Sequence, residues 1–505
     1  MATTPEASSV SEYTVVIMAG GKARELHPLT EDTALCMLPV ANRPLLSYQL
    51  EMLARCGTKH AMVVASKSSA KSIMQCLESY PVRGLVASVE ATDDDAGSAD
   101  ALRSVADRIK TDFVVVSGDI ISDVMLQHVA DVHRMKDATL TMLLAAPRSK
   151  RRPGKGGKAA AAAKAAAAAA AKAAAEVPLE DRDVVALNED DSRIVMMASG
   201  ADFDAKGKAS MRKSLLRRYP RLAVCSSLMD THVYFFAHWV LDLLAEKTSF
   251  KSIKAHLVPF LINKQFRRKT LSSLAHLAAP DLALMGIEPV ALGLGGGADD
   301  SLALPQQHFL SRSTGGESET PKAGGDSLSA RALSSGQISP AEVAADLVRC
   351  HYVLATDVYA LRINSIESYK AANRDVPAKN QVCDLRPLIP PSSRYQFIAD
   401  SVELTNINAV GSESCVGDST TLGDGATVKK SNIGAHCTIG ANVKIVNSVV
   451  MDHVSIADDA VIANSVVCES ATIGAGARLE NYTVAGGATI EPAADHDGNS
   501  FVPPS

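Results

Sequence analysis

The residues best suited to chemistry lie near the start of the chain, in a glycine-containing loop after an apolar segment. Thr14 to Met18 has the composition of a short buried strand, and Gly20 and Gly21 follow two residues later. Glycine has no Cβ, so backbone N–H groups in such a loop can approach a phosphate closely. Asp119 follows a second apolar run, at the edge where open α/β sheets bind ligands. The pattern predicts a nucleotide-binding pocket.

This loop belongs to a longer segment, residues 20–40, which reads GGKARELHPLTEDTALCMLPV. The segment resembles the signature of the sugar-1-phosphate nucleotidyltransferases, GGxGTRLxPLT followed by PKPxLPV. Where that signature has an arginine that clamps the triphosphate and then a lysine, this chain has Glu25 and Leu35. Nucleotidyl transfer needs cations to stabilise the charge that develops on the phosphate. The resemblance therefore predicts the fold of the family without its activity.

Three further segments extend the resemblance. AGSADALR, residues 96–103, matches the family loop GTAxA near the nucleotide base, and SGDI places Asp119 at the metal-binding aspartate. Because Ser117 and Gly118 are turn residues, we interpret Asp119 here as a strand-end aspartate rather than a metal ligand. In SLMDTHVYFF, Asp230 stands where active relatives have asparagine or serine, and His232 stands where they have glycine. A histidine at that glycine position would narrow the sugar pocket.

Taken together, these matches imply a vestigial nucleotide pocket. Residual binding of a nucleotide or sugar nucleotide stays open, but the resemblance implies no catalytic residue, no metal site and no required cofactor. The residues that would form the pocket are Gly20, Gly21, Ser98 and Asp119.

The first part of the chain alternates apolar runs with amphipathic stretches, as βαβ units and a parallel sheet do. Strands are expected at residues 14–18, 61–65, 85–90, 113–117 and 140–145, and helices at residues 44–56, 98–109 and 122–135. The pattern resumes with VVALNE, RIVMMAS and RLAVCSSLMDTHVYFF, then with a strand-like segment at residues 352–363 and the helix-like IESYKAANRD. We predict one α/β nucleotidyltransferase-like, Rossmann-like domain.

Two low-complexity tracts interrupt this domain. Residues 148–176 are rich in alanine, lysine and arginine, and residues 293–339 are rich in glycine and serine. Such compositions bury too little apolar surface to fold alone, so we interpret both as solvated insertions. Two basic clusters, residues 213–221 and 264–269, are more typical of solvated faces than of a site for RNA or an acidic partner.

The C-terminal region has a 17-residue period. Three columns of aliphatic residues result, with steps of six, six and five, and small residues follow many of them four positions later. This resembles the hexapeptide-repeat left-handed β-helix, a three-sided prism. Cys437 falls on an inward position, where we expect a small core residue. The columns are Val416, Ile433, Val450, Val467 and Val484; Leu422, Ile439, Ile456, Ile473 and Ile490; and Val428, Ile445, Ile462 and Leu479.

The 505-residue chain has a net charge of −5 and 9 cysteines without a CxxC pair or a zinc spacing. That balance gives no general nucleic-acid signature, and the cysteines are typical of reduced thiols inside a cell. The polar N-terminus lacks an apolar signal core. The sequence also lacks a P-loop, an HExxH motif and a nucleophile elbow. We expect a cytosolic protein that binds neither DNA nor a membrane.

An α/β domain followed by a β-helix is shared by sugar-nucleotide pyrophosphorylases and by subunits of eukaryotic translation initiation factor 2B. The segments GSADALRSVADRIKTDFVVVSGDIISDVMLQHVADVHRMKDATLTMLL, RYPRLAVCSSLMDTHVYFF and TSFKSIKAHLVPFLINKQF resemble the gamma-subunit family of that factor. The resemblance implies a non-catalytic part of a guanine-nucleotide exchange complex. Its partners would be the epsilon subunit, the other subunits, and initiation factor 2 as substrate, with regulation through phosphorylation of the substrate's alpha subunit.

Two other functions are weighed against this one. An active sugar-1-phosphate nucleotidyltransferase would need other cations, such as Lys22 and Arg24, in place of the missing pair. A hexapeptide-type acyltransferase would need a catalytic histidine, whereas His436 and His453 fall on repeat turns where solvent exposure is expected. The epsilon family would add a helical domain after the β-helix, whereas this sequence ends at FVPPS.

The expected boundaries are as follows: a disordered N-terminus at residues 1–12, the α/β domain at 13–375, a linker at 376–395, the β-helix at 396–493 and a flexible tail at 494–505.

Overall fold

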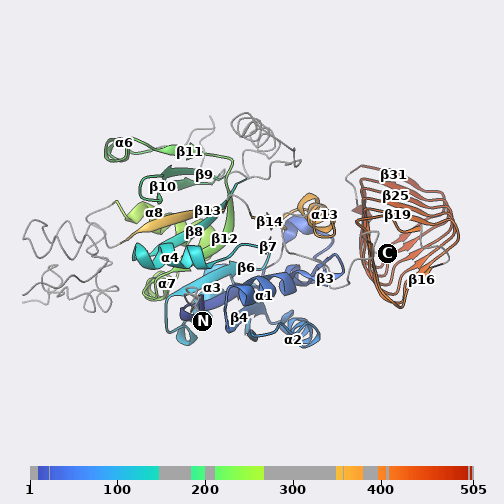
Figure 1. The fold of residues 1–505 in the computed structure, drawn as a ribbon, viewed down its shortest axis with the longest axis horizontal. Helices are drawn as coiled ribbons and strands as arrows, with labels where there is room; N and C mark the ends of the chain where they lie inside the picture. The colour runs from blue at the N-terminus through green and yellow to red at the C-terminus, as the bar shows by residue number, and fades with distance from the viewer. Residues whose placement is uncertain are drawn as a thin grey trace, which may run out of the picture.

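The computed structural model describes residues 10–21, 23–146, 183–199, 211–266, 348–355, 358–378, 396–404, 409–498 and 501–502. An α/β domain and a stack of β-coils lie side by side (Figure 1). Both low-complexity tracts lie outside these residues, as does the second half, residues 267–269, of the basic cluster at 264–269. Among the described helices, none combines the length and apolarity that a membrane span requires.

A ten-stranded sheet forms the centre of the α/β domain. Its edge-to-edge order is β11 (Ala223–Cys225), β9 (Val184–Asn188), β10 (Arg193–Ala198), β13 (Cys350–Ala355), β8 (Leu140–Ala145), β12 (Met229–Phe236), β6 (Phe113–Ser117), β1 (Thr14–Met18), β4 (His60–Ser66) and β5 (Val86–Thr92). All five strands expected before residue 146 are present, and three have the expected bounds.

The sheet is mixed. Its five strands that precede residue 146 share one direction, as expected for that part of the chain, and the antiparallel strands come from later segments. The strands β5, β4, β1 and β6 are parallel, and β13 is parallel to β8. The strand β12 runs antiparallel between β6 and β8, and β9, β10 and β11 are antiparallel neighbours. Strand runs buried on both faces look alike in sequence whichever direction they take, so the reversal of β12 has no local signal.

Helices cover both faces of this sheet. Successive side chains of β1 point to opposite faces, and each face has its own apolar core. On one face α1 (Leu45–Arg55), α2 (Ala70–Ser79) and α4 (Gln127–Met135) pack with Val15 and Ile17. On the other face α3 (Ser98–Ser104), α7 (Val240–Glu246) and α8 (Val258–Lys264) pack with Val16. The result is the three-layer α/β arrangement that the alternation predicted.

Three local expectations need correction. The helix expected from residue 122 begins only at Gln127, because β7 (Ile120–Ser122) pairs with β14 (Ala360–Arg362). The expected strand at residues 352–363 is therefore two strands, β13 and β14. Residues 10–12, expected to be disordered, form a 3-10 helix in which Val10 is buried in the core below α4.

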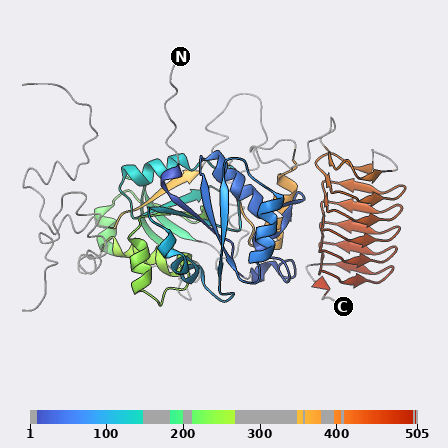
Figure 2. The ribbon, with the colours of Figure 1, turned by 90° about the horizontal axis from the view of Figure 1, so that it is seen from below.

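The C-terminal prism has the predicted repeat. Strands of two or three residues form three parallel sheets that stack coil on coil, as the edge-on view shows (Figure 2). Partners are 17 residues apart throughout the aliphatic columns, for example Ile433 with Val450 and Ile439 with Ile456. All three predicted columns are buried in one core, and the fold is a left-handed β-helix. Pairing continues past residue 493, through β31 (Asp495–Asp497) and β32 (Phe501–Val502).

A fourth apolar core joins the two parts. It combines Tyr48 of α1 and Tyr369 of α13 (Ile366–Asp375) with Val449 and Val466 from the first sheet of the prism. These two valines point away from the prism core, while their neighbours Val450 and Val467 point into it. One face of the prism therefore docks on the α/β domain.

Candidate functional site

A small pocket lies where β1 and β6 end, and three of the four residues of the predicted pocket line it. Gly20 and Gly21 come from the loop after β1, and Asp119 follows β6. Residues 18–21, 23, 35–36 and 117–119 form its walls, and its volume is about 150 Å³. Pockets that hold drug-sized ligands usually exceed about 300 Å³, so this pocket is small for a nucleotide.

The backbone brings these loops together through two close contacts. The Ala19 N–H donates to the carbonyl of Val64 at 2.8 Å, and the Gly118 N–H donates to the carbonyl of Met18 at 2.9 Å. A Cβ on Gly118 would lie 2.6 Å from the Met18 carbonyl oxygen, so a larger residue does not fit there. Gly21 has φ +141°, in a region that L side chains rarely adopt.

The arginine and the lysine of the family signature have no cationic counterpart at the matching positions of this chain. Glu25 is exposed on a 3-10 helix, Arg24–Leu26. Leu35 begins another, Leu35–Met37, lines the pocket, and packs against the core that joins the α/β domain to the prism. Arg24 is exposed, and Lys22 lies outside the described residues. Leu35 stands where the family signature has its lysine, and its apolar side chain packs against the contact between the α/β domain and the prism.

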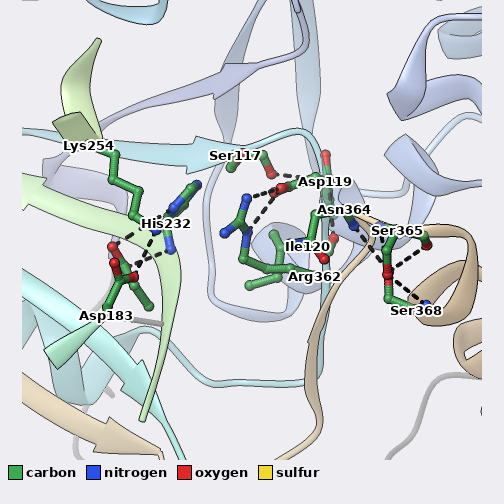
Figure 3. A network of polar contacts seen from close by, with 12 residues as sticks. Ser117, Asp119, Ile120, Asp183, His232, Lys254, Arg362, Asn364, Ser365 and Ser368 are labelled. Atoms are coloured by element: carbon green, nitrogen blue, oxygen red, sulfur yellow. Dashed lines mark hydrogen bonds and ion pairs between the residues drawn. The ribbon is translucent and has the colours of Figure 1, made fainter. Parts of the chain in front are cut away.

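The carboxylate of Asp119 is bound by an internal cation, as Figure 3 shows. The Arg362 guanidinium donates to Oδ2 of Asp119 from Nε at 2.9 Å and from Nη2 at 2.5 Å. Both side chains are largely buried, with exposed fractions of 17% and 8%. Burial disfavours the charged guanidinium, but Asp119, together with Asp230 and Tyr234, outweighs this effect, and the pKa of Arg362 is raised. Sequence reasoning missed this pair because 243 positions separate the partners.

The residues around Asp119 do not fit the divalent cation that the fold family implies. Mg²⁺ takes six oxygen ligands in octahedral geometry, but Oδ2 of Asp119 already accepts two N–H groups. Within the part of the chain that the structure describes, no cluster of three or more His, Cys, Asp or Glu residues has the arrangement of a metal site. A guanidinium on the carboxylate also repels a second cation.

Asp230, the second departure noted in the sequence, is buried, and its contacts are with His232 and Tyr234. Its carboxylate accepts hydrogen bonds from the Tyr234 hydroxyl at 2.5 Å and from the His232 backbone N–H at 3.0 Å. Burial raises the pKa of Asp230 and lowers the pKa of His232 well below its usual value. His232 has φ +55°, a conformation that glycine adopts more easily. It is not among the residues that line the pocket.

Ser98, the fourth residue of the predicted pocket, has a structural contact instead. Its hydroxyl accepts a hydrogen bond from the Ile253 N–H at 2.9 Å. A Cβ on the preceding Gly97 would lie 2.1 Å from the Lys251 carbonyl oxygen. The loop before α3 is therefore packed against residues 251–253, and Ser98 is absent from the pocket lining.

In the prism, the remaining candidate residues behave as expected. His436 and His453 are exposed at turns with φ values of 56° and 59°, and their rings stack with centroids 5.1 Å apart. Cys437 is 1% exposed, and burial raises its pKa to about 11. It is a small core residue, as predicted.

The docking contact between the prism and the α/β domain was not predicted. The Asn432 side-chain amide donates to both the backbone and side-chain oxygens of Asn373 at 2.8 Å, and Asn373 Oδ1 also accepts from the Ala41 N–H at 3.0 Å. The Asn42 amide donates to the Ile433 carbonyl at 2.6 Å. The outward positions of the first sheet include the apolar Val449 and Val466, whereas those of the second include Thr438, Ser455 and Thr472. This difference does not identify the surface that covers the two valines.

Two family models match this chain. The model described as "Nucleotidyl transferase" matches residues 14–257, and the model described as "EIF2B subunit epsilon LbH domain" matches residues 393–494. The first match covers every strand of the ten-stranded sheet except β13, and the second covers most of the prism. Both support the fold class predicted from the sequence.

Curated relatives extend the similarity across both parts. The chain is 29% identical to the translation initiation factor eIF2B subunit gamma of Dictyostelium discoideum over 440 residues, 84% of this chain and 88% of that protein. It is 30% identical to the subunit of the same name from Schizosaccharomyces pombe over 262 residues, 51% of this chain and 52% of that protein. A mannose-1-phosphate guanylyltransferase of Mycobacterium tuberculosis is 28% identical over 130 residues, 26% of this chain and 36% of that enzyme.

Proposed function

We propose that this chain, a homologue of the eIF2B gamma subunits, is a non-catalytic subunit of the eIF2B guanine-nucleotide exchange complex. The observation that carries the proposal is the similarity to the gamma subunit of D. discoideum, which extends over 84% of this chain. The similarity to the guanylyltransferase covers only 26% of the chain. Partners would be the epsilon and other subunits, with initiation factor 2 as the substrate of the complex, in the cytosol.

Loss of nucleotidyl transfer is the second part of the proposal. Transfer would require cations around the triphosphate and a free metal-binding carboxylate. Here Glu25 is exposed as an anion, Leu35 packs in an apolar core, and Arg362 binds Asp119. Nucleotide exchange makes no covalent bond. It couples the binding of two ligands to one protein, so it can proceed without these groups.

A rigid prism suits this role. Its three flat sheets carry stacked strands at regular spacing, and one of them is already fixed to the α/β domain. The other faces keep outward residues such as Thr438, Ser455 and Thr472 exposed. Repeat folds of this kind present extended surfaces to partners. We propose that one of these faces contacts other subunits.

Affinity purification of the full chain from its own cells tests the assembly. The expected result is recovery of the other eIF2B subunits, and release of GDP from initiation factor 2 that slows when this chain is depleted. Absence of those subunits under gentle conditions would contradict the proposal.

The catalytic question needs a separate assay. Purified chain is incubated with Mg²⁺, sugar phosphates and GTP or ATP, and pyrophosphate release is measured beside the M. tuberculosis guanylyltransferase as a positive control. We expect no release above the blank. Turnover comparable to the control would favour an active sugar-1-phosphate nucleotidyltransferase instead.

A further inference from the structure

The bond between Arg362 and Asp119 connects the pocket to the segment that docks the prism. We propose that Arg362 serves as a fixed internal cation at the carboxylate that matches the family's metal-binding aspartate, and that their bond holds the docking segment on the pocket. The inference goes beyond membership in a complex, because it concerns one ion pair of this chain and holds whichever partners the chain has.

Arg362 supplies, at the Asp119 carboxylate, the positive charge that a bound metal ion would otherwise supply. Its guanidinium contacts a single carboxylate oxygen, Oδ2, with two nitrogens at 2.9 and 2.5 Å. The other oxygen, Oδ1, is buried and has no hydrogen-bond partner among the described residues. Without Arg362, the carboxylate would be a buried and uncompensated anion at the pocket wall, which is an unfavourable state that a cation relieves. Arg362 thus excludes a divalent cation by occupying its ligand.

The same residue is part of a continuous route to the prism. Directly after Arg362, the Ile363 N–H donates to the Asp119 carbonyl at 2.7 Å. Two residues later Ser365 and Ser368 form a capping box that begins α13, and Figure 3 shows this cap beside Asp119 and Arg362. Capping fixes the direction in which a helix starts, so the position of Asp119 sets the position of α13.

The far half of α13 completes the route. Asn373 accepts the Asn432 amide at 2.8 Å, and Lys370 donates to the Asn464 carbonyl at 3.3 Å. Tyr369 is fully buried in the core shared with the prism and donates its hydroxyl to the Pro39 carbonyl at 2.7 Å. One helix therefore joins the pocket at its first turn to the prism at its last turns.

The test compares Mn²⁺ binding by four forms of the full chain: wild type, Arg362→Gln, Asp119→Asn and the double variant. Electron paramagnetic resonance counts free Mn²⁺, and no enzymatic activity is needed. We expect wild type, Asp119→Asn and the double variant to bind Mn²⁺ weakly, and Arg362→Gln to bind it at least tenfold more tightly. Lys67→Gln is the matched control, because the Lys67–Asp93 pair is exposed by 65% and 80%.

Hydrogen exchange measures the second part of the proposal. Amides of α13 should exchange at least tenfold faster in Arg362→Gln than in wild type, and Mn²⁺ should slow them again. The double variant, which buries two neutral amides, should melt at a higher temperature than Arg362→Gln, and Lys67→Gln should match wild type.

Several results would overturn the proposal. Wild-type binding of Mn²⁺ that Asp119→Asn abolishes would show that Arg362 does not exclude the cation. Unchanged Mn²⁺ binding by Arg362→Gln would contradict the exclusion of the cation. Unchanged hydrogen exchange of α13 in that variant would contradict the role of the bond in holding the docking segment. If Arg362→Gln fails to fold, recovery of folding in the double variant supports the ion pair, and equal failure of both contradicts it. Loss of co-eluting subunits would affect only the proposed complex.

Discussion

Replacement of Val449 by aspartate should separate the prism from the α/β domain while leaving both folded. Val449 lies on β23 (Val449–Val450), is 5% exposed, and packs in the core shared by the two domains. Its neighbour Val450 points into the prism core instead. The substitution therefore places a carboxylate at the joint and changes nothing inside the prism.

The expected cost can be estimated from the burial. Losing the burial of a valine side chain costs roughly 2 kcal/mol. Keeping an unpaired carboxylate buried adds several kcal/mol, because Val449 packs among the apolar side chains of that shared core. A total of at least about 5 kcal/mol corresponds to a shift of more than roughly a thousandfold toward the undocked arrangement. The domains should open, because water then solvates the carboxylate.

Hydrogen exchange and small-angle scattering measure this opening. Peptides covering α13 and β23 should lose protection, and the radius of gyration should increase, while strands β24 (Ser455–Ile456) and β25 (Val461–Ala463) keep their protection. The matched control is Ser455→Asp, which places the same charge at an exposed outward position of the same coil. Equal protection of α13 in both variants, or loss of protection at β25 in Val449→Asp, would refute the reasoning.

Three further predictions concern stability. Ile462→Ala leaves a cavity in the prism core, where Ile462 is fully buried, and should lower the free energy of unfolding by about 2–5 kcal/mol; denaturation of Val446→Ala, at a 42% exposed outward position, should show little change. Gly97→Ala should cost about 1–3 kcal/mol, because its Cβ would meet the Lys251 carbonyl at 2.1 Å, whereas Gly486→Ala, with its nearest atom at 3.5 Å, should melt nearly like wild type. Burial, with a smaller effect of His351, lowers the pKa of His133 to about 3. Below the unfolded-state pKa of about 6.5, the unfolded chain binds a proton that the folded chain refuses, so stability should fall from pH 6.5 toward pH 3. His133→Gln should make that decline shallower, by up to about 1.4 kcal/mol per pH unit, and an unchanged slope would contradict the assignment.

The sequence alone determined the features that depend on local periodicity. The prism is the clearest case: its residues repeat every 17 positions, each coil pairs with the next, and the three columns could be written down residue by residue. The strand β1, the glycine loop and the helix α13 were also predicted, because strand alternation, glycine placement and helix periodicity act over a few residues. The absence of the family cations could be predicted from residue types at Glu25 and Leu35 alone.

Only the tertiary structure decided which distant groups meet. The reversal of β12, the pairing of β7 with β14, and the bond from Arg362 to Asp119 join segments that are far apart in the chain. Local sequence does not identify such partners. The residues next to an arginine or an aspartate in the chain do not show whether that side chain is solvated or paired with a distant one. Docking of the prism has the same cause: outward Val449 and Val466 look like ordinary strand residues until α13 covers them. The structure thus pairs Asp119, which the sequence placed in a predicted nucleotide pocket, with Arg362 in the segment that leads to the domain joint.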